Sequence, residues 1–199
     1  MRNVNTHLHK PKLNKDKNKN NSDSEQSETE EESSKKIIIH KTLLKDIAGT
    51  LTTIISQNKN PKNQNDTFSH GHKPKISLFD YLLRIQKYSG IDNSTIIIAL
   101  IYIDRICIKK GITLTNYNIH RLLFTSILIS IKYNEDIIYD NLFYSKIGGV
   151  PVAELNKLEH EFLKMIGFGL FVSEEVYKKY YSYLNINDNS IKDWLLFSI

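Results

Sequence analysis

Two long apolar runs, Ile96–Ile103 and Leu122–Ile131, constrain the fold of this chain more than any other feature. On a helix, each run would place apolar side chains on nearly every face, and neither alternates apolar with polar residues as a half-buried strand does. A helix that is hydrophobic all round must be covered by neighbours on several sides. We therefore predict an all-α fold with two central helices, over Ile96–Ile108 and Asn116–Tyr133.

Amphipathic segments on either side of these runs supply the covering helices. Between Lys36 and Gln57, apolar residues recur at every fourth position, which places them on one face of a helix. Proline and glycine mark the following stretch, Asn58 to Lys75, as a long loop. The other predicted helices run from an N-cap at Ser77 to Gly90, from Tyr139 to Ile147 before Gly148-Gly149, from Pro151 to Gly167, and from Glu174 to Leu184.

The distribution of charged residues divides the chain into parts. Residues 1–36 hold almost no apolar side chains and are predicted to form a disordered charged tail, with a basic block at Lys10–Lys19 and an acidic block at Asp23–Glu32. Serines in the acidic block are candidates for phosphorylation, although an unmodified solvated tail is the simpler interpretation. The predicted parts are the tail over 1–36, an amphipathic helix over 37–57, a loop over 58–75, a helical domain over 76–184 and a C-terminal extension over 185–199.

No motif in the sequence predicts an enzyme. We find no phosphate-binding glycine loop, no nucleophile motif and no helical pair of histidines around a glutamate. The lone cysteine, Cys107, lies in an apolar run, where a buried and unreactive thiol is expected. His70 and His72 flank a glycine but have no further metal ligands nearby in the sequence. We therefore expect no catalytic residue, no metal, no cofactor and no small-molecule substrate.

The net charge of +5 does not by itself predict a nucleic-acid partner. The lysines are scattered among asparagines, and no basic motif interleaved with aromatic residues accompanies them, so no nucleic acid is expected. Both apolar runs are shorter than the ~20 residues that cross a bilayer, and the polar N-terminus lacks a signal-peptide pattern. We expect a soluble intracellular protein of the nucleus, the cytoplasm or both, with no membrane partner.

Two charges interrupt the more N-terminal of the central helices. Asp104 and Arg105 follow one another within a segment that is otherwise almost entirely apolar. An unpaired buried charge costs several kcal/mol, so at least one of them should have a buried partner. Arg84, in the preceding helix, is the natural candidate to pair with Asp104. The alternative is that Asp104 and Arg105 both reach solvent at an edge of the helix.

Several short motifs follow one another along the helical domain. They are Tyr81–Ile85, Tyr102–Arg105, Asn118–Leu123 with Lys132-Tyr133, Lys146–Gly149, and Glu154–Asn156. Taken together, in this order and spacing, they resemble the cyclin box of the P/U-type cyclins, the phosphate-pathway cyclin group. The resemblance covers roughly residues 37 to 184. It implies a single cyclin box of five helices around a central apolar helix, with an extra N-terminal helix and a short C-terminal helix.

The resemblance implies a non-catalytic function, namely a regulatory subunit that binds and activates a cyclin-dependent protein kinase in cell-cycle or nutrient-signalling control. At the matching positions, Lys132 and Glu159 would grip the backbone around the kinase's regulatory C-helix. Apolar contacts would come from Tyr133, Leu163, Phe168 and Leu170. The resemblance also matches Arg84 and Asp104 to an ion pair inside the box, in agreement with the argument from buried charge.

Two other functions remain open from the sequence. One is a cyclin-fold adaptor in a transcription or nucleic-acid complex, although such adaptors generally carry two repeats and clustered basic residues. The other is a scaffold that binds a kinase without activating it. One departure from the family pattern bears on the choice of kinase: Ile131 stands where the family usually has a small residue, just before the interface lysine.

Overall fold

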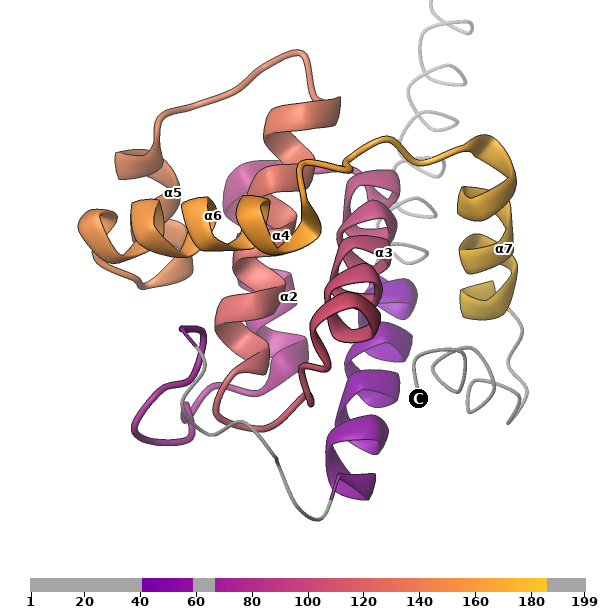
Figure 1. Ribbon diagram of the computed structural model, residues 1–199, viewed down its shortest axis with the longest axis horizontal. Helices are drawn as coiled ribbons and strands as arrows, with labels where there is room; N and C mark the ends of the chain where they lie inside the picture. The colour runs from indigo at the N-terminus through magenta and orange to yellow at the C-terminus, as the bar shows by residue number, and fades with distance from the viewer. Residues whose placement is uncertain (1–40, 59–66, 186–199) are drawn as a thin grey trace, which may run out of the picture. The chain divides into compact units, whose positions relative to one another are not determined.

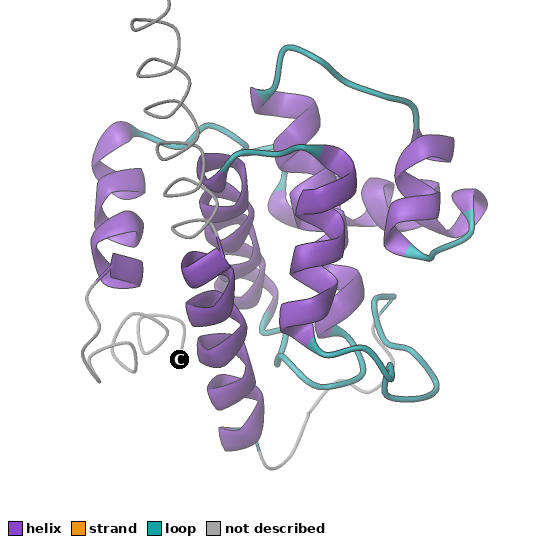
Figure 2. Cartoon of the chain, turned by 180° about the vertical axis from the view of Figure 1, so that it is seen from behind, coloured by secondary structure: helices purple, strands orange, loops and turns teal. Residues whose placement is uncertain are grey.

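The computed structural model describes residues 41–58 and 67–185, and every regular element within these ranges is a helix (Figures 1 and 2). The tail over 1–36, residues 37–40 and 59–66, and residues 186–199 of the predicted extension lie outside the described residues. The predicted all-α fold is confirmed. The helices are 41–57, α2 (Leu78–Ser89), α3 (Asn93–Lys110), α4 (Ile119–Asn134), α5 (Asn141–Gly148), α6 (Val152–Ile166) and α7 (Glu174–Asn185).

Helices α3 and α4 form the centre of the domain, as their all-round apolar character predicts. They pack against each other, α3 also contacts α6 and α7, and α4 also contacts α6 and α2. Small hydroxyl side chains lie in the α3–α4 contact: Ser126 donates to the carbonyl of Ala99 at 2.6 Å, and Ser130 donates to that of Thr95 at 2.9 Å. Because each buried hydroxyl has an acceptor, the two helices lie close together without an unsatisfied polar group at these serines.

The ends of the helices follow local hydrogen bonding. Ser77 is the N-cap of α2 and accepts from the backbone N–H of Asp80 at 3.0 Å, as predicted. Helix α4 begins at Ile119, later than the predicted Asn116, because Asn118 closes a turn by accepting from the N–H of Thr115 at 2.8 Å. Helix α5 begins at Asn141 because Asp140 is its N-cap and accepts from the N–H of Phe143. The structure contains the helices α2 to α7 that the sequence predicts, with these shifted starts and with α3 beginning at Asn93, ahead of the predicted Ile96.

The helix at 41–57 buries its apolar face in the same core as α2 to α6. Its predicted inward residues from Leu43 to Ile55 are all buried, whereas Ile39, at the start of the pattern, lies outside the described residues. Asn58 then donates to the carbonyl of Leu114 at 3.1 Å. The loops at 67–77 and 111–118 meet at the same end of the domain (Figure 2), where the N–H of His70 donates to the carbonyl of Tyr117.

The predicted ion pair between Arg84 and Asp104 is wrong. Arg84 lies on α2, which packs against α5, and its Nη2 donates to the carbonyl of Lys146 at 2.9 Å. Asp104 lies on α3 on the side that meets α7, where it accepts a hydrogen bond from the hydroxyl of Tyr180. Asp104 is buried and has a hydrogen-bond partner, as expected for at least one of the two charges, but the partner is the partly buried Tyr180, from a helix outside the family motifs.

Cys107 is buried in the core, as its apolar context predicts. Burial raises the pKa of the Cys107 thiol to about 12, and the nearby carboxylate of Asp104 adds to the shift. A thiol in this state is a poor nucleophile at neutral pH. None of the helices in the described ranges has the length and apolarity needed to cross a membrane.

Gly148 provides a test of core packing. A Cβ at this position would overlap the ring of Phe124, which is 2% exposed and cannot move away freely. We predict that Gly148→Ala lowers the free energy of unfolding by about 1–3 kcal/mol, measured by urea denaturation. Gly49→Ala is the matched control, because a Cβ there meets nothing within 4 Å; it should leave stability unchanged or raise it by up to about 1 kcal/mol. Equal effects of the two substitutions would contradict this packing.

Candidate functional site

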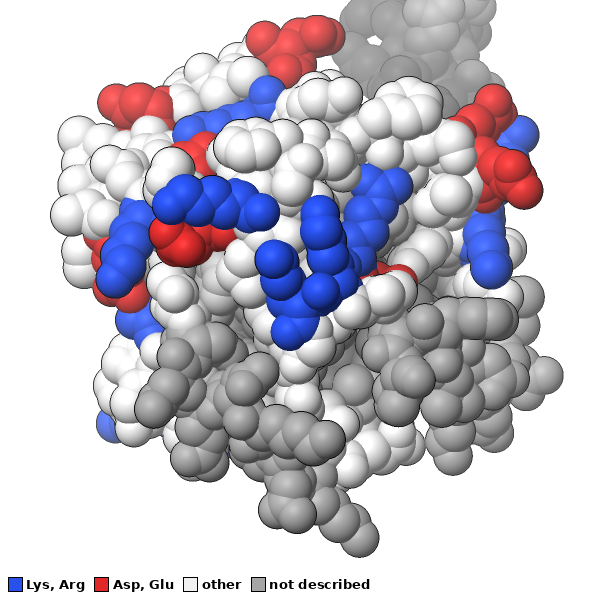
Figure 3. All heavy atoms as spheres, viewed as in Figure 1, with Lys and Arg blue, Asp and Glu red and all other residues white. Residues whose placement is uncertain are grey.

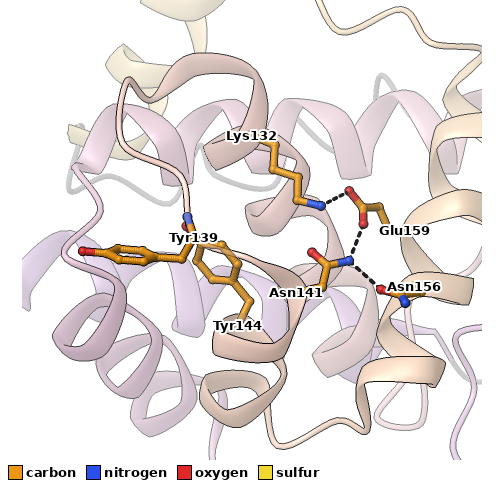
Figure 4. Close-up of polar contacts among 6 residues, drawn as sticks. All are labelled: Lys132, Tyr139, Asn141, Tyr144, Asn156 and Glu159. Atoms are coloured by element: carbon orange, nitrogen blue, oxygen red, sulfur yellow. Dashed lines mark hydrogen bonds and ion pairs between the residues drawn. The ribbon is translucent and has the colours of Figure 1, made fainter.

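The structure brings Lys132 and Glu159 together from different helices. Lys132 lies in the last turn of α4 and Glu159 lies in the middle of α6. The Nζ of Lys132 donates to Oε1 of Glu159 at 2.6 Å (Figure 4). The side chains are 31% and 15% exposed, so the pair sits at the surface with its carboxylate partly covered. An ion pair of this kind contributes at most about 1 kcal/mol to the free energy of folding. Its position at the surface therefore says more about a binding role than its contribution to stability does.

Asparagine side chains extend this pair into a network. Nδ2 of Asn141, the first residue of α5, donates to Oε2 of Glu159 and to Oδ1 of Asn156, each at 2.7 Å (Figure 4). Both carboxylate oxygens of Glu159 are therefore held by donors from two other helices. Oδ1 of Asn141 is shielded from solvent and has no partner among the described residues. The network fixes the rotamers of Lys132 and Glu159 relative to α4, α5 and α6.

Aromatic residues support the N-terminal end of α5, which carries Asn141. The rings of Tyr139 and Phe143 lie 4.4 Å apart, and that of Phe143 meets the Tyr144 ring edge to face at 5.3 Å. The backbone N–H of Tyr139 also contacts the hydroxyl of the buried Tyr144 at 3.4 Å. These contacts fix the loop from α4 into α5, so the loop holds Asn141 in place between Lys132 and Glu159.

The other predicted kinase contacts continue from Glu159 along α6. Leu163 lies one turn beyond Glu159 and is half-buried. Its carbonyl accepts from the N–H of Phe168 at 3.0 Å, which brings the segment after the helix back beside it. Phe168 is 66% exposed, whereas Leu170 packs partly against the core. Tyr133, beside Lys132, is about half exposed. The structure thus places the predicted residues along one strip of α4, α6 and the segment that follows α6.

Several apolar residues near this strip were not predicted from the sequence. Within the described ranges, large exposed apolar side chains gather on the loop from α4 to α5 and on the segment after α6. They are Ile137, Ile138 and Tyr139 on the first, with Leu142 next to them in the first turn of α5, and Phe171 beside Phe168 on the second. In the sequence these apolar residues stand within connections that are otherwise polar or contain glycine, and that pattern could have predicted an exposed apolar surface. Asn156, which is part of the Glu154–Asn156 motif, and Asn141 were likewise not predicted as site residues.

Ile131, the departure from the family pattern, points into the core. It is 3% exposed, while its neighbour Lys132 reaches the surface. Its bulk therefore acts on the packing beneath the pair and adds nothing to the exposed strip.

His70 and His72 lie side by side in the loop before α2. Their rings are 4.0 Å apart. Across residues 41–58 and 67–185, no group of three or more His, Cys, Asp or Glu side chains is placed to hold a metal ion.

The asparagine network can be tested by stability. We predict that Asn141→Ala lowers the free energy of unfolding by about 1–3 kcal/mol, because it leaves one carboxylate oxygen of the partly covered Glu159 without its donor. Asn156→Ala is the matched control, since Asn156 is exposed and water can replace its bond; its effect should stay within ~0.5 kcal/mol. Urea denaturation at neutral pH measures both. An Asn141→Ala effect no larger than that of the control would show that Asn141 does not hold Glu159.

Comparison with known proteins identifies the family. The family model described as Cyclin matches residues 3–170. Cyclin-U4-1 of Arabidopsis thaliana is 33% identical over 153 residues, which are 76% of this chain and 75% of that protein. Cyclin-U4-2 of the same plant is 43% identical over 113 residues, 56% of this chain and 52% of that protein. Cyclin-P3-1 of Oryza sativa subsp. japonica is 32% identical over 155 residues, 75% of this chain and 66% of that protein.

The matches agree with the motifs along the helical domain. Apart from Cyclin-U4-1, the chain spans between about half and two thirds of the length of these relatives. The relatives carry U-type and P-type names, so the predicted resemblance to the P/U-type cyclins is confirmed. Helix α7, which supplies the partner of Asp104, lies beyond the matched residues. The helices that carry the Lys132–Glu159 pair therefore belong to a cyclin box, and the chain is a member of the cyclin family.

Proposed function

We propose that this chain is a regulatory subunit that binds and activates a cyclin-dependent protein kinase, in cell-cycle or nutrient-signalling control. Cyclins are regulatory rather than catalytic proteins. The observation that carries the proposal is the Lys132–Glu159 pair, held by Asn141 at the surface beside exposed apolar side chains. Lys132 and Glu159 are 27 positions apart in the sequence, and the ion pair that they form at the surface contributes little to folding.

The pair offers both kinds of hydrogen-bonding group to a partner backbone. An ammonium has three N–H donors, and Glu159 takes one of those of Lys132. The remaining donors suit carbonyl groups, such as those at the end of a helix. Each carboxylate oxygen of Glu159 accepts one bond and can accept another, for example from a backbone N–H. Because the side chains are already fixed, a partner need not order them on binding.

The exposed apolar side chains would form the desolvated centre of the interface with the kinase. Tyr133 and Phe168 stand at the surface, and Leu163 lies partly covered between Glu159 and Phe168. Interfaces of this kind have an apolar, fully desolvated centre and a polar rim that fixes orientation. The proposed strip has this composition, with the Lys132–Glu159 pair as its polar part.

Activation would follow from binding one conformation of the kinase better than the other. A kinase is active when the glutamate of its C-helix pairs with the lysine that positions ATP. A surface that fits the inward position of the C-helix shifts the population toward the active state by its difference in affinity for the two states. This mechanism needs no catalytic group on the cyclin.

Reversal of the pair gives the sharpest test. We predict that the wild-type chain recovers a cyclin-dependent kinase from a native lysate of its source cells, and that Lys132→Glu and Glu159→Lys each abolish recovery. The double variant Lys132→Glu/Glu159→Lys should keep an intramolecular ion pair, although it loses the hydrogen bond from Asn141 to Glu159. It should still fail to recover the kinase, because donor and acceptor are exchanged. The loss in affinity should be at least about 30-fold, as for a broken interfacial charge contact. Mass spectrometry of the recovered proteins reads out the result.

Lys157→Glu is the control for charge, since Lys157 is an exposed residue of the same helix, and it should recover the kinase normally. The proposal fails if the wild-type chain recovers no kinase at moderate salt, or if the double variant recovers it fully. Activation is then measured separately, as the rate of peptide phosphorylation by the recombinant kinase with and without the chain. Binding without a rise in rate would support the scaffold function instead.

A further inference from the structure

Side chains from one face of α3 hold the segment that follows α6. The hydroxyl of Tyr102 donates to the carbonyl of Leu170 at 2.8 Å. Nη1 of Arg105 donates to the carbonyl of Gly169 at 2.8 Å, and Nζ of Lys109 donates to the carbonyl of Ile166 at 3.3 Å. Positions 102, 105 and 109 fall on one face of a helix. From position 102 to position 109 of α3, the acceptor carbonyls run from residue 170 back to residue 166, so the segment runs antiparallel to the helix.

The cations are placed where a helix end favours them. The last carbonyls of an α-helix have no partner within the helix and carry partial negative charge. Helix α6 ends at Ile166 and its C-cap, Gly167, has φ 69°. Nζ of Lys109 lies so close over this turn that a Cβ at Gly167 would be 2.6 Å from it. Figure 3 shows Lys and Arg side chains gathered on the face where α3 and the end of α6 lie in Figure 1.

This anchoring decides where the aromatic side chains point. With the carbonyls of residues 166, 169 and 170 bound to α3, Phe168 and Phe171 are left 66% and 72% exposed. Phe168 also adopts φ 57°, which is unfavourable for a residue with a Cβ and needs support from its surroundings. Such an exposed and strained arrangement is not what the segment would adopt for its own packing.

We propose that Tyr102, Arg105 and Lys109 are positioning residues. They hold the segment 166–171 in its binding shape before the partner arrives, so that Phe168 and Phe171 are preformed anchors for an apolar groove of the kinase. This inference rests on the proposed function, and it adds Phe171 to the interface. Since the anchors are already ordered, binding loses less conformational freedom.

A double-mutant cycle separates positioning from direct contact. We predict that Arg105→Gln/Lys109→Gln weakens binding of the recombinant kinase, the one recovered in the pull-down, by about tenfold in the wild-type background. In the Phe168→Ala/Phe171→Ala background the same change should cost less than about twofold, because there is nothing left to position. Lys110→Gln removes one positive charge next to Lys109, takes no part in these bonds, and should cost less than about twofold in both backgrounds.

An equal loss in both backgrounds would mean that the cations contact the kinase themselves, and no loss in either would mean that they position nothing; both results overturn the proposal. Tyr102→Phe, which removes only the hydroxyl, is a second variant and should behave as Arg105→Gln/Lys109→Gln does. Arg105→Lys/Lys109→Arg keeps both donors and should restore most of the affinity.

Hydrogen exchange of the free chain tests the positioning without any kinase. The amides of Phe168 and Leu170, which donate to the carbonyls of Leu163 and Phe168, should exchange faster in Arg105→Gln/Lys109→Gln, with the amides of α4 unchanged. Unchanged exchange at Phe168 and Leu170 overturns the inference whether or not a kinase binds. Faster exchange in a chain that binds no kinase would leave the positioning in place and refute the proposed function alone.

Discussion

The close packing of α3 against α4 sets the geometry of the remainder of the domain. Ser126 and Ser130, one turn apart on α4, donate to carbonyls one turn apart on α3, so small side chains occupy these two points of the contact between the helices. Larger residues at these positions would push the helices apart. Because α4 is fixed in this way, its last turn carries Lys132 to α6, while other side chains of α3 bind the segment after α6 and helix α7.

A tyrosine and an arginine three residues apart bind backbone carbonyls at two places in the domain. On α2, Tyr81 donates to the carbonyl of Gly148 and Arg84 to that of Lys146, at the end of α5. On α3, Tyr102 and Arg105 do the same for the carbonyls after α6. In the first place the neighbouring helix satisfies carbonyl groups that a helix end leaves without partners; in the second it satisfies carbonyl groups of the segment that follows the helix. The first pair holds the far end of the helix that carries Asn141, and the second holds the segment that carries Phe168.

The sequence was sufficient for the helices and for most of the core, because periodicity and helix-ending glycines are local signals. Ser77 and the apolar character of α3 and α4 led to the correct elements. Pairing across helices was harder. Arg84 and Asp104 lie on consecutive helices, and the sequence therefore suggested that they pair. In the structure α2 packs on α5 and α3 meets α7, so Arg84 binds the carbonyl of Lys146 and Asp104 binds Tyr180. Lys132 and Glu159 were found through resemblance alone, since periodicity marks them as ordinary surface residues.

The proposed binding mode requires that the face around the Lys132–Glu159 pair meets the kinase, and photo-crosslinking tests this most directly. A photo-crosslinking amino acid is placed at Tyr133, beside the Lys132–Glu159 pair, or at Tyr88 on α2; these side chains are 51% and 59% exposed. With the recovered kinase in recombinant form, position 133 should give crosslinks that map to the kinase's C-helix, and position 88 should give none. Crosslinks from position 88, or crosslinks from position 133 only to other parts of the kinase, would contradict the proposed face.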